Sequence, residues 1–123
     1  MFTKKNSRDY RLQMAGVRMR PLVFEEKSLM CEFLLEGGHK LPAHHHPYEQ
    51  SGYLLSGRLR FRIGEEWHET QPGDSWCIPE GVVHEVEVLE EAHLVEIFIP
   101  IRPDYLPDPS ERRAGPLHQT DNR

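Results

Sequence analysis

The sequence predicts an all-β fold of the jelly-roll type, built as one domain. Short apolar runs are broken about every ten residues by glycine, proline or pairs of charged residues, which is typical of a β-sandwich or β-barrel. Helical periodicity is weak along the whole chain. The length of 123 residues lies near the usual size of a domain and leaves no room for a second hydrophobic core.

Nine candidate strands follow from these runs. In order along the chain they cover residues 21–25, 29–35, 40–46, 51–55, 58–63, 66–70, 75–78, 83–89 and 93–99. Turn-forming residues separate them, among them Ser56-Gly57, Gly64-Glu65 and Pro79-Glu80-Gly81. Nine short strands fit a jelly roll, whose two sheets enclose a space large enough for a ligand.

The two ends of the chain differ from this core. We expect residues 1–20 to form an N-terminal arm or an edge strand, residues 21–100 the barrel, and residues 101–123 a tail rich in proline and arginine. The N-terminal arm could also cross to a second subunit. Five prolines occur from Pro100 to Arg123, so the tail is expected to be irregular.

Composition bears on partners and location. The formal net charge is −5, and no basic stripe with interleaved aromatic residues occurs, so we expect no nucleic-acid partner. The polar start of the chain and the lack of any long apolar stretch predict no secretion signal and no membrane contact, and hence a cytoplasmic protein. Cys31 and Cys77 form no C-x-x-C pattern and are expected to be buried free thiols rather than ligands or a bridge.

A run of histidines, His44-His45-His46, indicates a transition-metal site. In a strand, side chains two residues apart share a face, so His44 and His46 can point together into a cavity while His45 points away. Gln50 has the same parity across the Pro47-Tyr48 corner, and His84 could complete a set of three nitrogens and one oxygen. The alternative is an accident of composition or a purification tag, but tags sit at termini and this run is internal.

The spacing around these residues resembles the two signatures of the cupin family. The first signature, G-x5-H-x-H-x3-E-x6-G, is met by Gly38, His44, His46, Gln50 and Gly57, and the second, G-x5-P-x-G-x2-H, by Gly73, Pro79, Gly81 and His84. Two positions depart from the pattern, since Gln50 replaces the usual glutamate and Val88 an asparagine that often ends the second motif. The resemblance implies a cupin double-stranded β-helix of the small RmlC-like kind. It also implies one divalent metal ion, nickel, zinc, iron or manganese, held by His44, His46, Gln50 and His84.

Glu49 is an alternative to Gln50 as the oxygen ligand. Its parity is opposite to that of His44 and His46, and it breaks the six-residue spacing to Gly57, so we favour Gln50. The stretch from His44 to Gln50 also resembles the His-x-His-Pro-x-Glu-Gln subgroup of cupins, in which glutamine occupies the ligand position. A neutral ligand leaves the charge of the ion uncompensated and increases its attraction for an anionic substrate.

The last predicted strand places a carboxylate, Glu96, among apolar residues. Facing inward, Glu96 would lie near the metal and could act as a general acid or base. Facing outward, it would be an ordinary surface glutamate of an edge strand. The sequence leaves both orientations open.

Residues 96–106 resemble the end of the barrel in one group of cupins. These are small proteins of pectin and alginate degradation that convert 4,5-unsaturated uronates to the linear ketone. Their pocket pattern is matched here by Glu96, Phe98 and Arg102, followed by Asp104-Tyr105-Leu106, although the acid is usually aspartate in that group. The resemblance implies that Glu96 moves a proton, that Phe98 keeps the pocket dry, and that Arg102 binds the substrate carboxylate. It therefore implies a small anionic sugar acid as substrate.

Two other functions remain open. Three-histidine cupins that resemble this chain include metal-dependent dioxygenases of small organic substrates, and a non-catalytic module that binds a metal and a sugar is a third possibility. Cupins frequently pair, so we expect a homodimer.

Several other residues are candidates for a role in the site. Arg58, Arg60 and Arg62 alternate with apolar residues and are expected to be solvated, or else to place one arginine at the cavity mouth. We expect Trp67 and Trp76 to serve packing rather than substrate stacking. The remaining histidines have no matched spacing and are assigned to the surface or the core; they are His39, His68, His93 and His118.

Overall fold

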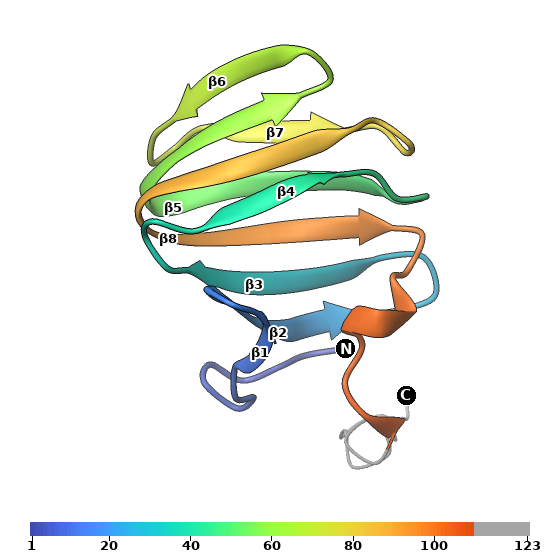
Figure 1. Cartoon of the computed structure of the whole chain (residues 1–123). Coiled ribbons are helices and arrows are strands. Elements are labelled where there is room, and N and C mark those ends of the chain that lie inside the picture. Colours follow the sequence, from blue (N-terminus) through green and yellow to red (C-terminus); the bar gives the residue numbers. More distant parts are fainter. Residues whose placement is uncertain (110–123) are drawn as a thin grey trace.

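The computed structural model describes residues 1–109, which form an all-β jelly roll as the sequence predicts (Figure 1). Within these residues the strands are β1 (Arg11–Met14), β2 (Val17–Phe24), β3 (Leu29–Leu35), β4 (Lys40–His44), β5 (Glu49–Ile63), β6 (Glu66–Thr70), β7 (Ser75–Ile78) and β8 (His84–Ile99). A short 3₁₀ turn, η1 (Pro103–Tyr105), follows β8. None of the helical structure in the described part of the chain has the length and apolar character needed to cross a membrane.

The two longest strands, β5 and β8, pair antiparallel and belong to both sheets of the roll. The second half of β8 pairs with β3 on one side and with the first half of β5 on the other, in a larger sheet with the order β1-β2-β3-β8-β5-β7. The first half of β8 pairs with β4 and with the second half of β5, which β6 extends into a smaller sheet. Both strands therefore bend from one layer to the other (Figure 1).

The core lies between the inner faces of these two sheets. Alternate residues of β3 are buried, from Leu29 to Leu35, and β8 shows the same alternation on either side of its exposed centre at Glu90 and Glu91. Such alternation produces one apolar and one wetter face per strand. Cys31 is fully buried as expected, and burial raises the pKa of its thiol. The expected burial of Cys77 is wrong, because that thiol is exposed on β7.

Several strand boundaries differ from the prediction. The stretches 51–55 and 58–63 form one strand, β5, and 83–89 and 93–99 form another, β8. The strand predicted over 40–46 ends at His44. In the region expected to form an N-terminal arm or an edge strand, residues 1–20, the structure has β1 and the first residues of β2. β1 is an edge strand of the larger sheet, and the boundary expected at residue 20 falls inside β2. Residues 110–123 of the expected tail, with His118, lie outside the described residues.

Ser56-Gly57 has the composition of a turn but forms a bend within β5. The register with β8 shifts on both sides of Ser56, as expected for a β-bulge. Gly57 has a φ of 94°, which a residue with a Cβ rarely adopts. Its backbone also packs so closely on β8 that a Cβ would lie 2.2 Å from the carbonyl oxygen of Glu91. The bend therefore depends on glycine for two separate reasons.

We predict that Gly57→Ala destabilises the protein more than Gly38→Ala. Gly38 has a similar φ of 88°, but nothing lies within 4 Å of a Cβ built on it. Gly38→Ala should therefore cost only the strain of a left-handed backbone, about 1–2 kcal/mol. Gly57→Ala should add a further penalty of about 1–3 kcal/mol, because it overpacks the contact with β8. Equal free energies of unfolding in urea for the two variants would contradict this account.

Candidate metal centre

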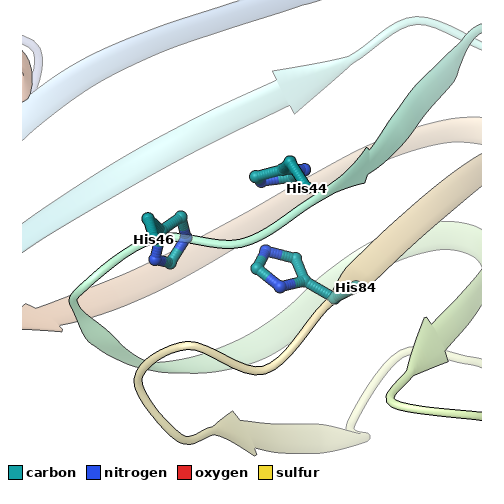
Figure 2. Close-up of side chains that lie close together, drawn as sticks. All are labelled: His44, His46 and His84. Carbon is teal, nitrogen blue, oxygen red and sulfur yellow. The ribbon is translucent and has the colours of Figure 1, made fainter.

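Three histidine side chains converge at one end of the roll (Figure 2). His44 ends β4, His46 lies on the connection that follows, and His84 begins β8. One ring nitrogen from each lies within 4.8 Å of the others, and the ring centroids of His44 and His84 are 4.2 Å apart. Since metal–nitrogen bonds are about 2.0–2.1 Å long, a small inward movement of these rings lets them bind one ion.

Backbone pairing holds the segments of the histidines together. His44 on β4 lies directly opposite His84 on β8 in the sheet. On the other side, the amide of Gly81 donates a hydrogen bond to the carbonyl of His46, at 2.9 Å. The loop before β8 is therefore tied to the segment after β4, which explains why residues some forty positions apart in the chain share one site.

Hydrogen bonds also set the orientation of two of the rings. Nδ1 of His44 lies 2.9 Å from the carbonyl oxygen of Pro42, and Nδ1 of His84 lies 3.0 Å from that of Val82. A carbonyl can only accept, so each ring carries its proton on Nδ1. The lone pair of each Nε2 is then left for a metal, in the arrangement usual for histidine ligands.

His46 and Gln50 carry buried polar atoms without hydrogen-bond partners. Among residues 1–109, no partner of either ring nitrogen of His46 or of Oε1 of Gln50 has the geometry of a full hydrogen bond, although the side chain of Gln50 lies close enough to His46 to raise its pKa. Buried polar atoms in proteins are almost always satisfied, so each such exception calls for an explanation. A bound cation would satisfy Oε1 of Gln50 and the unprotonated nitrogen of His46, and the residues present therefore fit a metal ion.

Two of the histidines, His46 and His84, are held in the form that binds metals. Burial lowers the pKa of His84 to about 4, and the neighbouring imidazoles and Arg102 add to the effect. Burial also lowers the pKa of His46, again with a contribution from the charge of Arg102. Both imidazoles are therefore neutral near pH 7, and a neutral imidazole is the form that coordinates a metal.

Glu96 faces the interior, which resolves the orientation that the sequence left open. Its Oε2 accepts hydrogen bonds from Nε2 of Gln50 at 2.7 Å and from Nε1 of Trp76 at 3.0 Å. Burial raises the pKa of Glu96 to about 7, although these two hydrogen bonds and the charge of Arg102 act in the opposite direction. The carboxyl group can therefore gain or lose a proton near neutral pH.

Arg102 lies after β8, with its guanidinium among aromatic rings. The guanidinium is 3.8 Å from the ring centroid of Tyr105, and it also lies over Tyr48 and Phe98. Within residues 1–109 its only hydrogen bonds run from Nε to Asp104, at 3.3 and 3.4 Å. Its two terminal nitrogens therefore remain available to pair with a carboxylate.

These groups border one cavity of about 330 Å³. The predicted site residues among its lining are His44, Gln50, His84, Glu96, Phe98 and Arg102. His46 lies beside this wall, with its ring 5.0 Å from that of His84. Gln50 is buried whereas Glu49 is exposed, so it is the glutamine that faces the histidines. The remaining lining is largely apolar, as in most small-molecule sites.

Other candidate residues of the sequence lie outside this site. The three arginines of β5 form a ladder of ion pairs with glutamates on the outer face of the smaller sheet, so none lies at the cavity mouth; the ladder comprises Arg58, Arg60, Arg62, Glu69, Glu85, Glu87 and Glu90. Trp67 is exposed beside Arg62. Three remaining histidines lie near glutamates away from the site, in the pairs His39 with Glu36, His68 with Glu66, and His93 with Glu32.

The hydrogen bond from Trp76 to Glu96 was not predicted from the sequence, which assigned this tryptophan to packing. Packing is part of its role, since its ring centroid lies 5.1 Å from that of Phe61. The sequence did contain one sign of a role beyond packing, which is Gly52, because a glycine inside a strand often marks the close approach of another group.

Comparison with known proteins agrees with this architecture. The family model described as "Cupin domain" matches residues 31–99, and no curated protein sequence matches the chain. The structure is similar to that of KdgF from Halomonas sp., with a TM-score of 0.81 at 21% identity over 86% of this chain and 98% of that one. An RmlC-like cupin from Shewanella frigidimarina gives a TM-score of 0.81 at 20% identity, over 85% and 95% of the two chains. Protein TT1209 from Thermus thermophilus gives 0.68 at 26% identity, over 81% and 98%.

We predict that His84→Ala loses bound metal whereas His45→Ala keeps it. His45 is an exposed neighbour of the cluster and takes no part in it, so it is a matched control. Loss of a group that only hydrogen-bonds to a metal ligand typically lowers metal affinity about 10- to 100-fold. Loss of one of the three nitrogen donors themselves should lower it further. Elemental analysis of the purified variants measures the metal content. The site is misassigned if both variants hold as much metal as the wild type.

Proposed function

The chain belongs to the cupin domain family, and from this membership and the geometry of its site we propose that it is a metal-dependent enzyme acting on a small anionic, sugar-like substrate. The proposed reaction converts a 4,5-unsaturated uronate to its linear ketone. One observation carries the proposal: a histidine cluster, a buried carboxyl group at Glu96 and a guanidinium at Arg102 meet at a single cavity.

The residues that would hold the metal are His44, His46, His84 and Gln50. The free Nε2 atoms of His44 and His84 and the unpaired oxygen of Gln50 are suitable donors for nickel, zinc, iron or manganese. A metal bound by these residues would supply Lewis acidity toward a substrate oxygen. All four ligands are neutral, so they leave the site attractive to an anion.

Arg102 would bind the carboxylate of the uronate. The two terminal guanidinium nitrogens match the spacing of carboxylate oxygens and can bind them bidentately. Stacking on Tyr105 and the contact of Nε with Asp104 limit the rotation of the side chain. The substrate would then be oriented at its carboxylate end before the reaction, which is a large part of enzymatic rate enhancement.

Glu96 would move the proton. Ring opening breaks the bond between the anomeric carbon and the ring oxygen, and carbon 4 gains a proton as the enol becomes a ketone. A proton lost from a hydroxyl balances the proton gained by carbon, so the reaction is an isomerisation. A carboxyl group with a pKa of about 7 suits both transfers, and the buried ring of Phe98 keeps bulk water away from them.

Two further observations support the uronate as substrate. The order of Glu96, Phe98 and Arg102 matches the pattern of the uronate-converting cupins, followed by the same Asp-Tyr-Leu sequence. The similarity to KdgF extends over nearly the whole length of that protein, although its 21% identity establishes only a shared fold. Glu96 is one methylene longer than the usual aspartate, and its hydrogen bonds with Gln50 and Trp76 fix where the longer side chain ends.

We also propose a cytoplasmic homodimer. Exposed apolar side chains lie on the outer face of the larger sheet, on β5 and β8; they are Tyr53, Leu55 and Ile99. A patch of this kind suits a contact between two copies related by a twofold axis, the commonest arrangement of homo-oligomers. Light scattering should give twice the mass of the chain, and Tyr53→Lys should shift the mass toward that of the monomer. A wild-type mass equal to one chain would refute the dimer.

We predict that the metal-loaded protein accelerates the loss of absorbance from the conjugated double bond of an unsaturated galacturonate. A chelator should abolish the acceleration. Glu96→Gln should keep the metal content but lower turnover by about 10²-fold or more, because it removes the proton-transferring group. Glu69→Gln, the same change within the exposed arginine ladder, should leave turnover unchanged.

Three results would count against this function. Oxygen uptake without loss of the double bond would favour a metal-dependent dioxygenase. Binding of the uronate without turnover would favour a non-catalytic sugar-binding module. Full turnover in Glu96→Gln would remove Glu96 from the mechanism.

A further inference from the structure

The indole of Trp76 packs directly against Gly52, which has no side chain to exclude it. A Cβ built on Gly52 would be 2.3 Å from Cε2 of Trp76 and 2.4 Å from Nε1, which is too close for any real contact. The indole thus occupies the space above β5 that any other residue at position 52 would fill.

This arrangement places Trp76 and Glu96 on either side of the same glycine. Gly52 on β5 is directly opposite Trp76 on β7 and directly opposite Glu96 on β8. Residues that are two strands apart in a sheet do not ordinarily touch, because the side chain of the central strand separates them. Since position 52 has no side chain, Nε1 of Trp76 reaches across β5 and donates to Oε2 of Glu96 at 3.0 Å.

The same carboxylate oxygen also controls the amide of Gln50. Nε2 of Gln50 donates to Oε2 of Glu96 at 2.7 Å. The amide nitrogen and oxygen lie on opposite sides of the amide carbon, so this hydrogen bond turns Oε1 away from Glu96. That oxygen is the buried atom without a partner, and it is the atom that a metal would use.

We propose that Trp76, seated on Gly52, is a positioning residue that holds the Glu96 carboxylate and through it the metal-facing orientation of Gln50. In this role Trp76 acts through Glu96, to which its indole N–H is hydrogen-bonded. The contact of its ring with Phe61 would persist in a phenylalanine variant, so packing and positioning can be separated by experiment. The expected effect of Trp76 on turnover rests on the proposed function, whereas the hydrogen-bond network itself does not.

The chain has only two tryptophans, so its two indole N–H groups should give separate signals in a proton–nitrogen NMR spectrum. The full chain loaded with zinc, which is diamagnetic, is the sample. In Glu96→Leu the Trp76 signal should move upfield and exchange faster with solvent, because its acceptor is gone, while the Trp67 signal stays in place. Glu96→Gln retains an acceptor oxygen and should give a smaller shift.

Measurements of zinc affinity and of enzyme kinetics test the positioning role of Trp76. Zinc affinity should fall about 10-fold in Glu96→Leu, which frees the amide of Gln50, and should be kept in Glu96→Gln. Trp76→Phe should lower kcat on the uronate about 10-fold with little change in KM, because it loosens the acid but keeps Arg102, the proposed contact for the substrate carboxylate. Gly52→Ala should behave like Trp76→Phe, since a Cβ displaces the indole. Trp67→Phe is the matched control and should match the wild type.

Two results would overturn the proposal. One is an indole signal of Trp76 that is the same in Glu96→Leu and the wild type. The other is a wild-type kcat in Trp76→Phe. The NMR spectrum requires no substrate, so it tests the hydrogen-bond network even if the protein does not convert the uronate. If the wild type converts the uronate and Trp76→Phe is equally active, the positioning role of Trp76 is refuted and the proposed function still stands.

Discussion

The antiparallel pairing of β5 with β8 is the constraint on which both the fold and the candidate site depend. The pairing runs from Glu49 opposite Ile99 to Ile63 opposite His84, and it passes through both sheets. Because β8 changes layer along its length, its first residue, His84, joins the histidine cluster from one sheet while Glu96 enters the same cavity from the other. A straight pair of strands would carry these two residues away from each other. The bulge next to Gly57 therefore shapes the chemistry of the cavity as well as its walls.

The charge of the site is distributed in an unusual way for a metal centre. The three imidazoles have an amide, that of Gln50, as the candidate fourth ligand, so the candidate ligands bring no negative charge. The nearest carboxyl group is Glu96, one hydrogen bond beyond Gln50. A glutamate at position 50 would place two carboxyl groups in direct contact, and each would oppose the ionisation of the other. The amide avoids this repulsion, because it offers an oxygen toward the histidines and a donor toward Glu96. Gln50 and Glu96 are thus best understood as one unit.

Much of the fold and the histidine cluster could be predicted from the sequence, for identifiable reasons. Ligand geometry restricts spacing, so the intervals between His44, His46, Gln50 and His84 carried strong information. Turn chemistry was less reliable, because Ser56-Gly57 has the same composition whether a strand ends or bends there. The alternation of arginine with apolar residues in β5 identified the polar face of the strand. It could not tell whether that face points to the mouth of the cavity or to bulk solvent. The hydrogen bond of Trp76 depends on the direction of an indole across three strands, which no local pattern specifies.

Arg102 belongs to a part of the chain that is separate from the candidate metal ligands. Arg102 follows the last strand, and its guanidinium is held by Tyr105 and Asp104 from the same short segment, with Tyr48 as a contact from the barrel. None of the histidines relies on that segment for its backbone pairing. Residues 101–106 can therefore change without disturbing the backbone pairing that holds the three histidines together. Under the function proposed above, a cupin with this same cluster can change the acid that it binds through one short segment.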